Sequence, residues 1–259
     1  MKRLYEEKSN LAFVSILYHP DDNALISIER AMRAGFNPVI YLNDVSDEYL
    51  AKLKSLNVTI LGCNSNVGLG RAFFDIENYL IENGFFCYLY FDQDTVVADS
   101  AWEKIKSTYD YTDPDVGLIF YTSSDINRND FVISSGCLFS LSVIKKVGFH
   151  DSSYFVEGVD YEFCLRLKIS GYKIKINHID GIDHNSLQDG VDIKLLGFDF
   201  RVRDYGLSRT VDFNRSQFKL FMLALNNKNY SSILFFIKSI FIFNVKEFVS
   251  KAILSFKVR

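Results

Sequence analysis

Short apolar runs alternate with amphipathic segments along the first hundred residues of the chain. The apolar runs predict β-strands at residues 11–17, 38–42, 58–61 and 86–91. Between them, apolar residues at helical spacing predict helices at residues 21–34, 47–56 and 70–83. This alternation, with short connections, is typical of an α/β fold with a mostly parallel sheet and helices on both faces.

The second half of the chain has a more mixed pattern. Apolar runs and helical spacing there predict strands at residues 116–121, 131–140 and 172–176, and a helix at 159–170. After Asn214 the sequence becomes helical and apolar with few interruptions. We therefore expect an α/β domain at residues 1–214 and a basic, apolar helical tail at residues 215–259.

Charge is distributed unevenly along the 259 residues, although the net charge is only −3. Residues 215–259 carry eight basic side chains and one acidic one, a net +7, whereas residues 1–214 carry 21 basic and 31 acidic ones, a net −10. An acidic body does not suit nucleic acid as a partner. A basic, apolar tail suits an anionic membrane surface.

The four cysteines, Cys63, Cys87, Cys137 and Cys164, are scattered and form no C-x-x-C pair. They are typical of reduced thiols in a cytoplasmic protein, not of a disulfide or zinc framework. The N-terminus has no long apolar core and is not a signal peptide. We expect a cytoplasmic protein, with the tail offering a peripheral contact at the inner face of the cell membrane.

Two carboxylates, Asp92 and Asp94, stand directly after the predicted strand at residues 86–91, separated by Gln93. In open α/β sheets, ligands bind at the carboxyl ends of the strands. Hard carboxylate oxygens at that edge suit Mg²⁺ or Mn²⁺ holding a substrate diphosphate. The alternative interpretation is a solvated turn.

A glycine-containing loop follows the third predicted strand and opens a helix. Asn66 and Gly68 belong to it. Glycine there allows a tight turn and close approach of a ligand, and the helix N-terminus offers free N–H groups to an anion. The G-x-G-x-x-G spacing of dinucleotide sites is absent. The alternative is a plain turn that caps a helix.

A second acidic cluster, Glu157, Asp160 and Glu162, surrounds a predicted helix start. Acids there interact favourably with the helix dipole, so helix capping is one interpretation. The other is a general base that takes a proton from a hydroxyl nucleophile. Arg166 is placed to pair with a neighbouring acid. His184 follows the next strand and is either structural or a metal ligand.

Taken in order, these motifs resemble family 2 glycosyltransferases, most closely the bacterial rhamnosyltransferase-like enzymes of O-antigen and capsule synthesis. The resemblance covers about residues 11–215. It is carried by Asn66-x-Gly68, Phe91-Asp92-Gln93-Asp94, Ser135-Gly136, Phe155-x-Glu157-x-x-Asp160-x-Glu162-x-x-Leu165-Arg166, Gly171-Tyr172-Lys173-Ile174 and His184. It implies a GT-A fold, which is Rossmann-like with a mostly parallel central sheet, here extended by a C-terminal helical appendage.

The resemblance also implies an activity and its partners. The activity is inverting transfer of a sugar from a nucleotide-diphosphate donor, dTDP-rhamnose or a UDP-sugar, with a divalent metal, Mg or Mn, as cofactor. The acceptor is a glycan or a polyprenyl-diphosphate-linked molecule in cell-surface polysaccharide synthesis. The protein is thus expected to be a metal-dependent hexosyltransferase.

Individual residues take roles from the same resemblance. Asp160 corresponds to the catalytic base, and Asp94, Asp92 and His184 correspond to metal ligands. Glu157 and Glu162 are expected on the acceptor side. The donor-binding positions are Asp44, Asn66, Gly68, Asp92, Gln93, Ser135 and Gly136.

The tail segment 229–245 holds one charged residue, Lys238, in a stretch apolar on all sides. It is shorter than the roughly 20 apolar residues that span a bilayer. Such a helix is buried in protein or in lipid. It therefore either packs on the catalytic domain or in a homodimer, or lies in a membrane interface.

Two other classes of protein remain as alternatives. A metal-dependent nucleotidyltransferase also uses acids on an α/β sheet, but it would place a glycine-rich, basic loop after the first strand. That loop here is Tyr18-His19-Pro20-Asp21-Asp22. The second alternative is a catalytically inactive sugar-nucleotide-binding subunit, against which the retained acids at 92, 94 and 160 argue.

Overall fold

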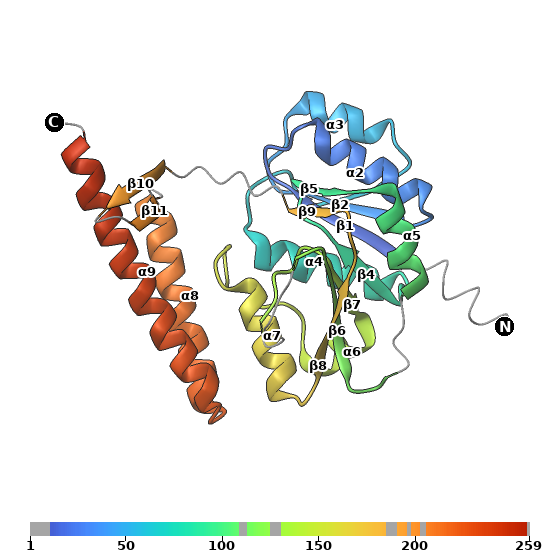
Figure 1. Cartoon of the computed structure of the whole chain (residues 1–259). Coiled ribbons are helices and arrows are strands. Elements are labelled where there is room, and N and C mark those ends of the chain that lie inside the picture. The colour runs from blue at the N-terminus through green and yellow to red at the C-terminus, as the bar shows by residue number, and fades with distance from the viewer. Residues whose placement is uncertain are drawn as a thin grey trace. The chain divides into compact units, whose positions relative to one another are not determined.

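The computed structural model describes residues 11–108, 113–124, 131–184, 191–195, 198–202 and 206–257 (Figure 1). The chain divides into two compact units, residues 1–186 and 187–259. The division falls earlier than the boundary at residue 214 expected from the sequence.

The first unit is built on a seven-stranded sheet among the described residues, in the order β3-β2-β1-β4-β7-β6-β8. Its strands are β1 (Leu11–Leu17), β2 (Asn37–Leu42), β3 (Thr59–Leu61), β4 (Cys87–Tyr90), β6 (Val116–Thr122), β7 (Cys137–Ser140) and β8 (Lys173–His178). In this sheet β7 runs antiparallel to β4 and β6, and the other pairings are parallel. The predicted mostly parallel sheet is confirmed.

Helices cover both faces of the sheet, which explains why strands such as β1 are buried along their whole length. The helices of this unit are α2 (Asp22–Arg33), α3 (Asp47–Lys54), α4 (Leu69–Glu82), α5 (Asp99–Thr108), α6 (Leu141–Val147) and α7 (Val159–Ile169). On one face, Trp102 of α5 contacts Phe13, Phe36 and Phe91 edge-on, with ring centroids 5.4–5.7 Å apart. The α2 and α3 helices add to that core.

The opposite face of the sheet is covered by α4 and α7. Phe139 of β7 contacts Phe73 of α4 and Phe163 of α7, with centroid distances of 6.1 and 5.4 Å. Burial of such side chains contributes most of the stabilisation, at roughly 25 cal/mol per Å² of apolar area. The two aromatic cores fix the register of the strands, and so the positions of the loops at their ends.

Several elements differ from the sequence pattern. A small antiparallel sheet pairs β5 (Thr95–Val97) with β9 (Ile182–His184), and α5 and α6 are further additions. The expected strand at 131–140 is a strand from Cys137 onward only. The reason lies at Gly136, whose φ of +93° turns the chain immediately before β7. The seven-residue α6 is too short to show a helical period.

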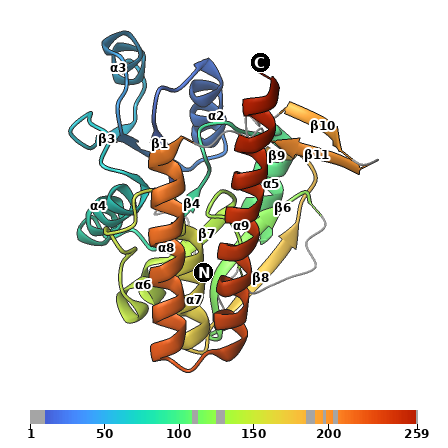
Figure 2. The same cartoon turned by 90° about the vertical axis from the view of Figure 1, so that its left-hand side faces the viewer.

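The second unit contains a β-hairpin and a helical hairpin. The strands are β10 (Val191–Leu195) and β11 (Phe198–Val202), and the helices are α8 (Leu207–Asn226) and α9 (Tyr230–Lys257). Figures 1 and 2 show α8 and α9 side by side and antiparallel. The helical appendage expected from the sequence is confirmed. Among the described helices, none combines the length and apolar content needed to cross a membrane.

Candidate functional site

The carboxyl ends of four neighbouring parallel strands, β3, β2, β1 and β4, meet at one edge of the first unit's sheet. Backbone bonds join the loops there: His19 N–H donates to the Asp44 carbonyl at 3.0 Å, and Asn43 N–H donates to the Leu17 carbonyl at 2.9 Å. This is the edge at which α/β sheets bind ligands. We call it the carboxyl edge.

Gln93 joins the loop after β4 to the loop after β1. Its side-chain oxygen accepts from Tyr18 N–H and its amide nitrogen donates to the Tyr18 carbonyl, both at 2.8 Å. Both ends of the amide are thereby used within the protein. Gln93, predicted to bind a donor, is positioned to hold the two loops together.

Asp92 lies at the centre of the carboxyl edge. Tyr90 O–H donates to its carboxylate at 2.7 Å, and the Asp92 backbone N–H donates to Ser135 Oγ at 3.0 Å. Ser135 is itself buried and bonded to Thr95 Oγ1 at 2.8 Å. Ser135, predicted as a donor ligand, therefore positions the backbone at Asp92.

Asp92 is influenced by the negative charges of other acidic side chains. Solvent reaches the Asp92 side chain, but protein encloses its carboxylate closely. That enclosure, with the negative charges of Asp160 and Asp94, outweighs the Tyr90 hydrogen bond and raises the pKa of Asp92 to about 7. The three aspartates predicted from the sequence thus act on one another.

Asp160 reaches this centre from the first turn of α7. Its carboxylate accepts a short hydrogen bond from Ser134 Oγ. Burial, helped by the charge of Glu157, raises the pKa of Asp160, while the bonds from Ser134 and the charge of His150 act in the opposite direction. A carboxylate with a raised pKa is a better proton acceptor near neutral pH.

Glu162 has different surroundings, although it lies only two residues after Asp160. It is buried and pairs with Arg166, whose Nη2 lies 2.9 Å from Glu162 Oε2. Arg166 also donates to the carbonyls of Val147, Gly148 and Phe149 at 2.7–2.8 Å. The predicted Arg166 pairing is confirmed, and Glu162 is its partner. The acceptor-side role of Glu162 stays a prediction.

The loop that precedes α4 is held by asparagine side chains. Asn66 Oδ1 accepts from Gly68 N–H at 3.1 Å and from Asn43 Nδ2 at 3.3 Å, and Asn43 Oδ1 accepts from Val67 N–H at 2.8 Å. Gly68 has a φ of +81°, and a Cβ there would lie 2.5 Å from the Phe155 ring. This glycine therefore lets the protein's own chain pass close by at Phe155, and its role in donor binding stays a prediction.

Gly136 is likewise explained by the sheet. Its N–H donates to the Tyr90 carbonyl and its carbonyl accepts from Tyr121 N–H, both at 2.8 Å. A Cβ on it would lie 2.3 Å from the Tyr121 carbonyl oxygen. Gly136, predicted to bind a donor, allows the loop to enter the sheet beside Asp92.

Asp44 lies on the rim of the carboxyl edge. Its φ is +92°, and its carboxylate is 3.6 Å from the Nε2 of His19, whose φ is +44°. Backbone conformations of this kind in non-glycine residues cost about 1–3 kcal/mol and cluster at functional sites. The rings of His19 and Tyr18 are tilted against each other with their centroids 4.2 Å apart. In the sequence, Tyr18 and His19 stand out only as part of the loop after β1.

The metal ligands predicted from the sequence are Asp94, Asp92 and His184. Among residues with described side chains, no three of His, Cys, Asp and Glu are close enough to hold a metal ion together. His184 lies in β9 opposite Thr95, and so beside Asp94 along the backbone. Its side chain is outside the described part of the structure.

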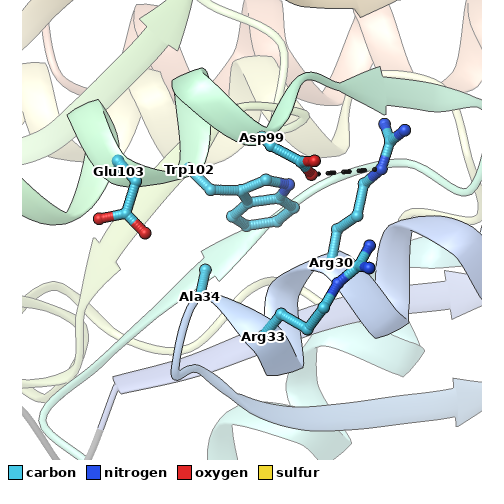
Figure 3. Close-up of a pocket in the computed structure, with 6 residues that line it drawn as sticks. All are labelled: Arg30, Arg33, Ala34, Asp99, Trp102 and Glu103. Atoms are coloured by element: carbon cyan, nitrogen blue, oxygen red, sulfur yellow. Dashed lines mark ion pairs between the residues drawn. The ribbon is translucent and has the colours of Figure 1, made fainter.

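A separate pocket of about 230 Å³ lies between α2 and α5 (Figure 3). Arg30 and Arg33 line one side, and Asp99, Trp102 and Glu103 line the other. Arg30 is held there by the Val97 carbonyl at 2.9 Å and by Asp99 at 3.5 Å. None of the predicted site residues lines this pocket.

Comparison with known proteins bears on the fold. No family model and no curated protein matches the sequence. Among solved structures, TarS 1–349 of S. aureus is similar with a TM-score of 0.50 and 11% identity, over 67% of this chain and 59% of that chain. TarS 1–349 in complex with UDP-GlcNAc gives the same TM-score and identity, over 83% and 66% of the two chains.

A glycosyltransferase involved in the glycosylation of the major capsid of PBCV-1 is more distantly similar, with a TM-score of 0.37 and 14% identity over 65% of this chain and 81% of that chain. At such identities the similarity concerns the fold. The chain has a glycosyltransferase-like, GT-A-like α/β fold with C-terminal helices. It spans 59% of the length of TarS 1–349.

Proposed function

We propose that this chain is an inverting glycosyltransferase that moves a sugar from a nucleotide-diphosphate donor to a hydroxyl acceptor. The observation that carries the proposal is the arrangement around Asp92 at the carboxyl edge of a GT-A-like sheet: Ser135 accepts from the Asp92 N–H, its neighbour Ser134 donates to Asp160, and the charges of Asp94 and Asp160 act on Asp92. The donor class is further supported by TarS, which was solved with UDP-GlcNAc. Perturbed carboxylates at a ligand-binding edge are typical of active sites.

On the donor side, Asp94 and Asp92 would hold a divalent cation, Mg²⁺ or Mn²⁺, with His184 as a further ligand. One or two carboxylates, completed by substrate phosphates and water, is the usual protein site for Mg²⁺. Crowded aspartates suit a cation because it relieves their mutual repulsion. Held by these residues, a divalent cation would supply positive charge for the leaving diphosphate.

The rim of the site is where the nucleoside would bind. Asp44 would bind a ribose hydroxyl, a role supported by its exposed carboxylate and left-handed backbone. The exposed ring of Tyr18 offers an apolar surface for the nucleobase. Asn66, Gly68, Gln93, Ser135 and Gly136 then serve by fixing the loops that present these groups.

On the acceptor side, Asp160 is the general base. It takes the proton of the acceptor hydroxyl while that oxygen forms a bond to C1 of the sugar. The bond from C1 to the diphosphate oxygen breaks, and its electron pair leaves with the diphosphate. A single displacement inverts the anomeric carbon. Glu157, whose charge helps raise the pKa of Asp160, lies within electrostatic reach of the same group.

The finer assignments follow from the sequence resemblance. The donor would be dTDP-rhamnose or a UDP-sugar, and the acceptor a glycan or polyprenyl-diphosphate-linked molecule of O-antigen or capsule type. The reaction would take place in the cytoplasm, at the inner face of the cell membrane where lipid-linked acceptors lie. A homodimer is compatible with this arrangement.

The direct test is nucleotide-diphosphate release from a panel of nucleotide sugars with Mg²⁺, Mn²⁺ or chelator. We expect release with one donor class, lost in Asp160→Asn and retained in Asp115→Asn. Asp115 is a matched control because it is exposed and pairs with Lys173 at 3.2 Å. Pyrophosphate release from a nucleoside triphosphate and a sugar 1-phosphate would instead identify a nucleotidyltransferase. Donor binding without any turnover would identify an inactive subunit.

A further inference from the structure

Helix α9 exposes a row of large apolar side chains along one side. Successive members are three or four residues apart, the spacing that places residues on one face of a helix. All are exposed, Phe248 to 76%. The row consists of Tyr230, Leu234, Ile237, Phe241, Val245 and Phe248.

Helix α8 carries a matching row, exposed over the same length of the hairpin. Its members also recur at helical spacing, and Leu207 is exposed to 75%. The row consists of Leu207, Val211, Phe218, Met222 and Leu225. Scattered exposed apolar residues need no explanation, but aligned rows on two adjacent helices mark an interaction surface.

The two helices pack through other sides. The rings of Phe213 and Phe243 stack at 3.7 Å, Asn244 Nδ2 donates to Asn214 Oδ1 at 2.7 Å, and Phe236 is buried. At 3.6 residues per turn, each exposed row lies about 100° further round its helix than the midpoint of these contacting Phe and Asn side chains. Because the helices are antiparallel (Figure 2), equal rotations bring both rows to the same side of the hairpin.

We call these eleven side chains the apolar face. Its borders are basic: exposed Arg215 on α8 and exposed Lys238 on α9 each follow their row by about 60° around the helix. Residues 206–257 carry eight basic and two acidic side chains, a net +6. A second copy of the hairpin would bring the same positive charge to the same surface. An anionic surface complements it.

We propose that the apolar face docks the protein onto an anionic lipid surface, with α8 and α9 both lying in the plane of the headgroups. The apolar rows enter the boundary of the acyl chains while the bordering Lys and Arg contact lipid phosphates. This placement agrees with the finding that neither described helix has the length and apolar content to span a bilayer. The proposal does not depend on the reaction proposed above.

The experiment is co-sedimentation of the full-length protein with phosphatidylcholine vesicles that contain or lack phosphatidylglycerol. We expect binding to the anionic vesicles, weakened at 1 M salt, where the Debye length falls to about 3 Å. Replacing Leu234, Phe241 and Phe248 together by Gln should weaken binding at least about tenfold, because apolar insertion is lost. Exposed side chains should tolerate this without loss of helix by circular dichroism.

Two further variants complete the test. Arg215→Gln with Lys238→Gln should weaken binding about tenfold and flatten its salt dependence, since each basic residue near an anionic surface contributes measurably. Ile26→Gln with Phe86→Gln, two exposed apolar residues of the first unit, is the matched control and should bind like wild type. Wild-type protein that ignores anionic vesicles, or a Gln triple variant that still binds them fully, overturns the proposal. Loss of a dimer in that triple variant, without vesicle binding by wild type, would assign the face to a second copy.

Discussion

Two tyrosines of β4 each donate a hydrogen bond to a carboxylate, with opposite consequences. Tyr88 donates to Glu77 at 2.8 Å inside the core, and Tyr90 donates to Asp92 at 2.7 Å at the carboxyl edge. Glu77 also accepts from the backbone N–H of His150 at 2.9 Å and contacts its ring. The Glu77 group is therefore satisfied by the protein itself.

The carboxyl edge is built differently. There the negative charges of Asp94 and Asp160 act on Asp92 and raise its pKa. A buried carboxylate that accepts hydrogen bonds from the protein contributes to a stable fold. Carboxylates that lie close together repel one another, and a bound cation or proton relieves that repulsion. On this chain, chemistry is therefore expected where acidic side chains lie close to one another, and not at every buried acid.

The largest expected effect comes from removing the Glu77 carboxylate, which accepts hydrogen bonds inside the core. Glu77→Ala leaves the buried Tyr88 O–H and His150 N–H without their acceptor, and unsatisfied buried groups cost about 1–3 kcal/mol each. We expect the free energy of unfolding, measured by urea denaturation, to fall by about 3 kcal/mol or more. The control is Glu82→Ala, at an exposed position of the same helix. Similar stability in the two variants would remove the structural role given to Glu77.

The next effect concerns chemistry instead of stability. Asp160→Asn keeps the size of the side chain but removes the proton acceptor, so turnover should fall about 10²-fold or more. Donor binding and the unfolding midpoint should stay close to wild type. The measurements are donor turnover and titration of the nucleotide diphosphate. Near-normal turnover would exclude Asp160 as the base.

A smaller effect is expected to distinguish Asp92 from Asp94, the two acids that follow β4. Asp94→Ala should weaken metal-dependent binding of a nucleoside diphosphate more than Asp92→Ala, because Asp94 is the proposed principal ligand. Calorimetric titration with Mn²⁺ and with chelator gives the comparison. Equal affinities of wild type and Asp94→Ala in the presence of metal would contradict this assignment.

The smallest expected effect is a pH dependence, because solvent reaches the Asp92 side chain and screens the interactions that shift its pKa. The pKa of Asp92 is raised to about 7, so the folded protein holds a proton there that the unfolded chain has already lost. Between about pH 4 and 7, wild type should therefore lose stability with rising pH relative to Asp92→Asn. Metal-dependent donor binding should weaken as pH falls through about 7. Parallel melting profiles of the two proteins across this window would refute the shift.

Much of the first unit follows from the sequence pattern. The apolar run at 11–17 forms β1, and the amphipathic segment at 21–34 contains α2. Both can be recognised because core-facing positions are apolar: they form a continuous run in a strand buried on both faces and recur at helical spacing in a helix buried on one face. Cys87, Cys137 and Cys164 are buried as expected of core thiols. This spacing of apolar residues cannot be recognised where an element is only a few residues long or where the chain turns.

The roles of the site residues depend on partners far away in the sequence. Gln93 is bonded to Tyr18, 75 residues away, and Ser135 to Asp92, 43 residues away. Such bonds leave no local signal. The contacts of Gln93 and Ser135 show that these two residues hold loops, and the site roles predicted for the motif positions stay predictions.

By itself, the sequence determined the α/β order, the acids at the end of β4 and the basic, apolar character of the tail, because these depend on neighbours along the chain. Only the tertiary structure decided that the charge of Asp160 acts on Asp92 while Glu162 pairs with Arg166. It also decided that the apolar rows of α8 and α9 share one side of the hairpin. Both outcomes depend on which faces of separate elements pack together. That packing is stabilised by contacts that exist only in the folded protein.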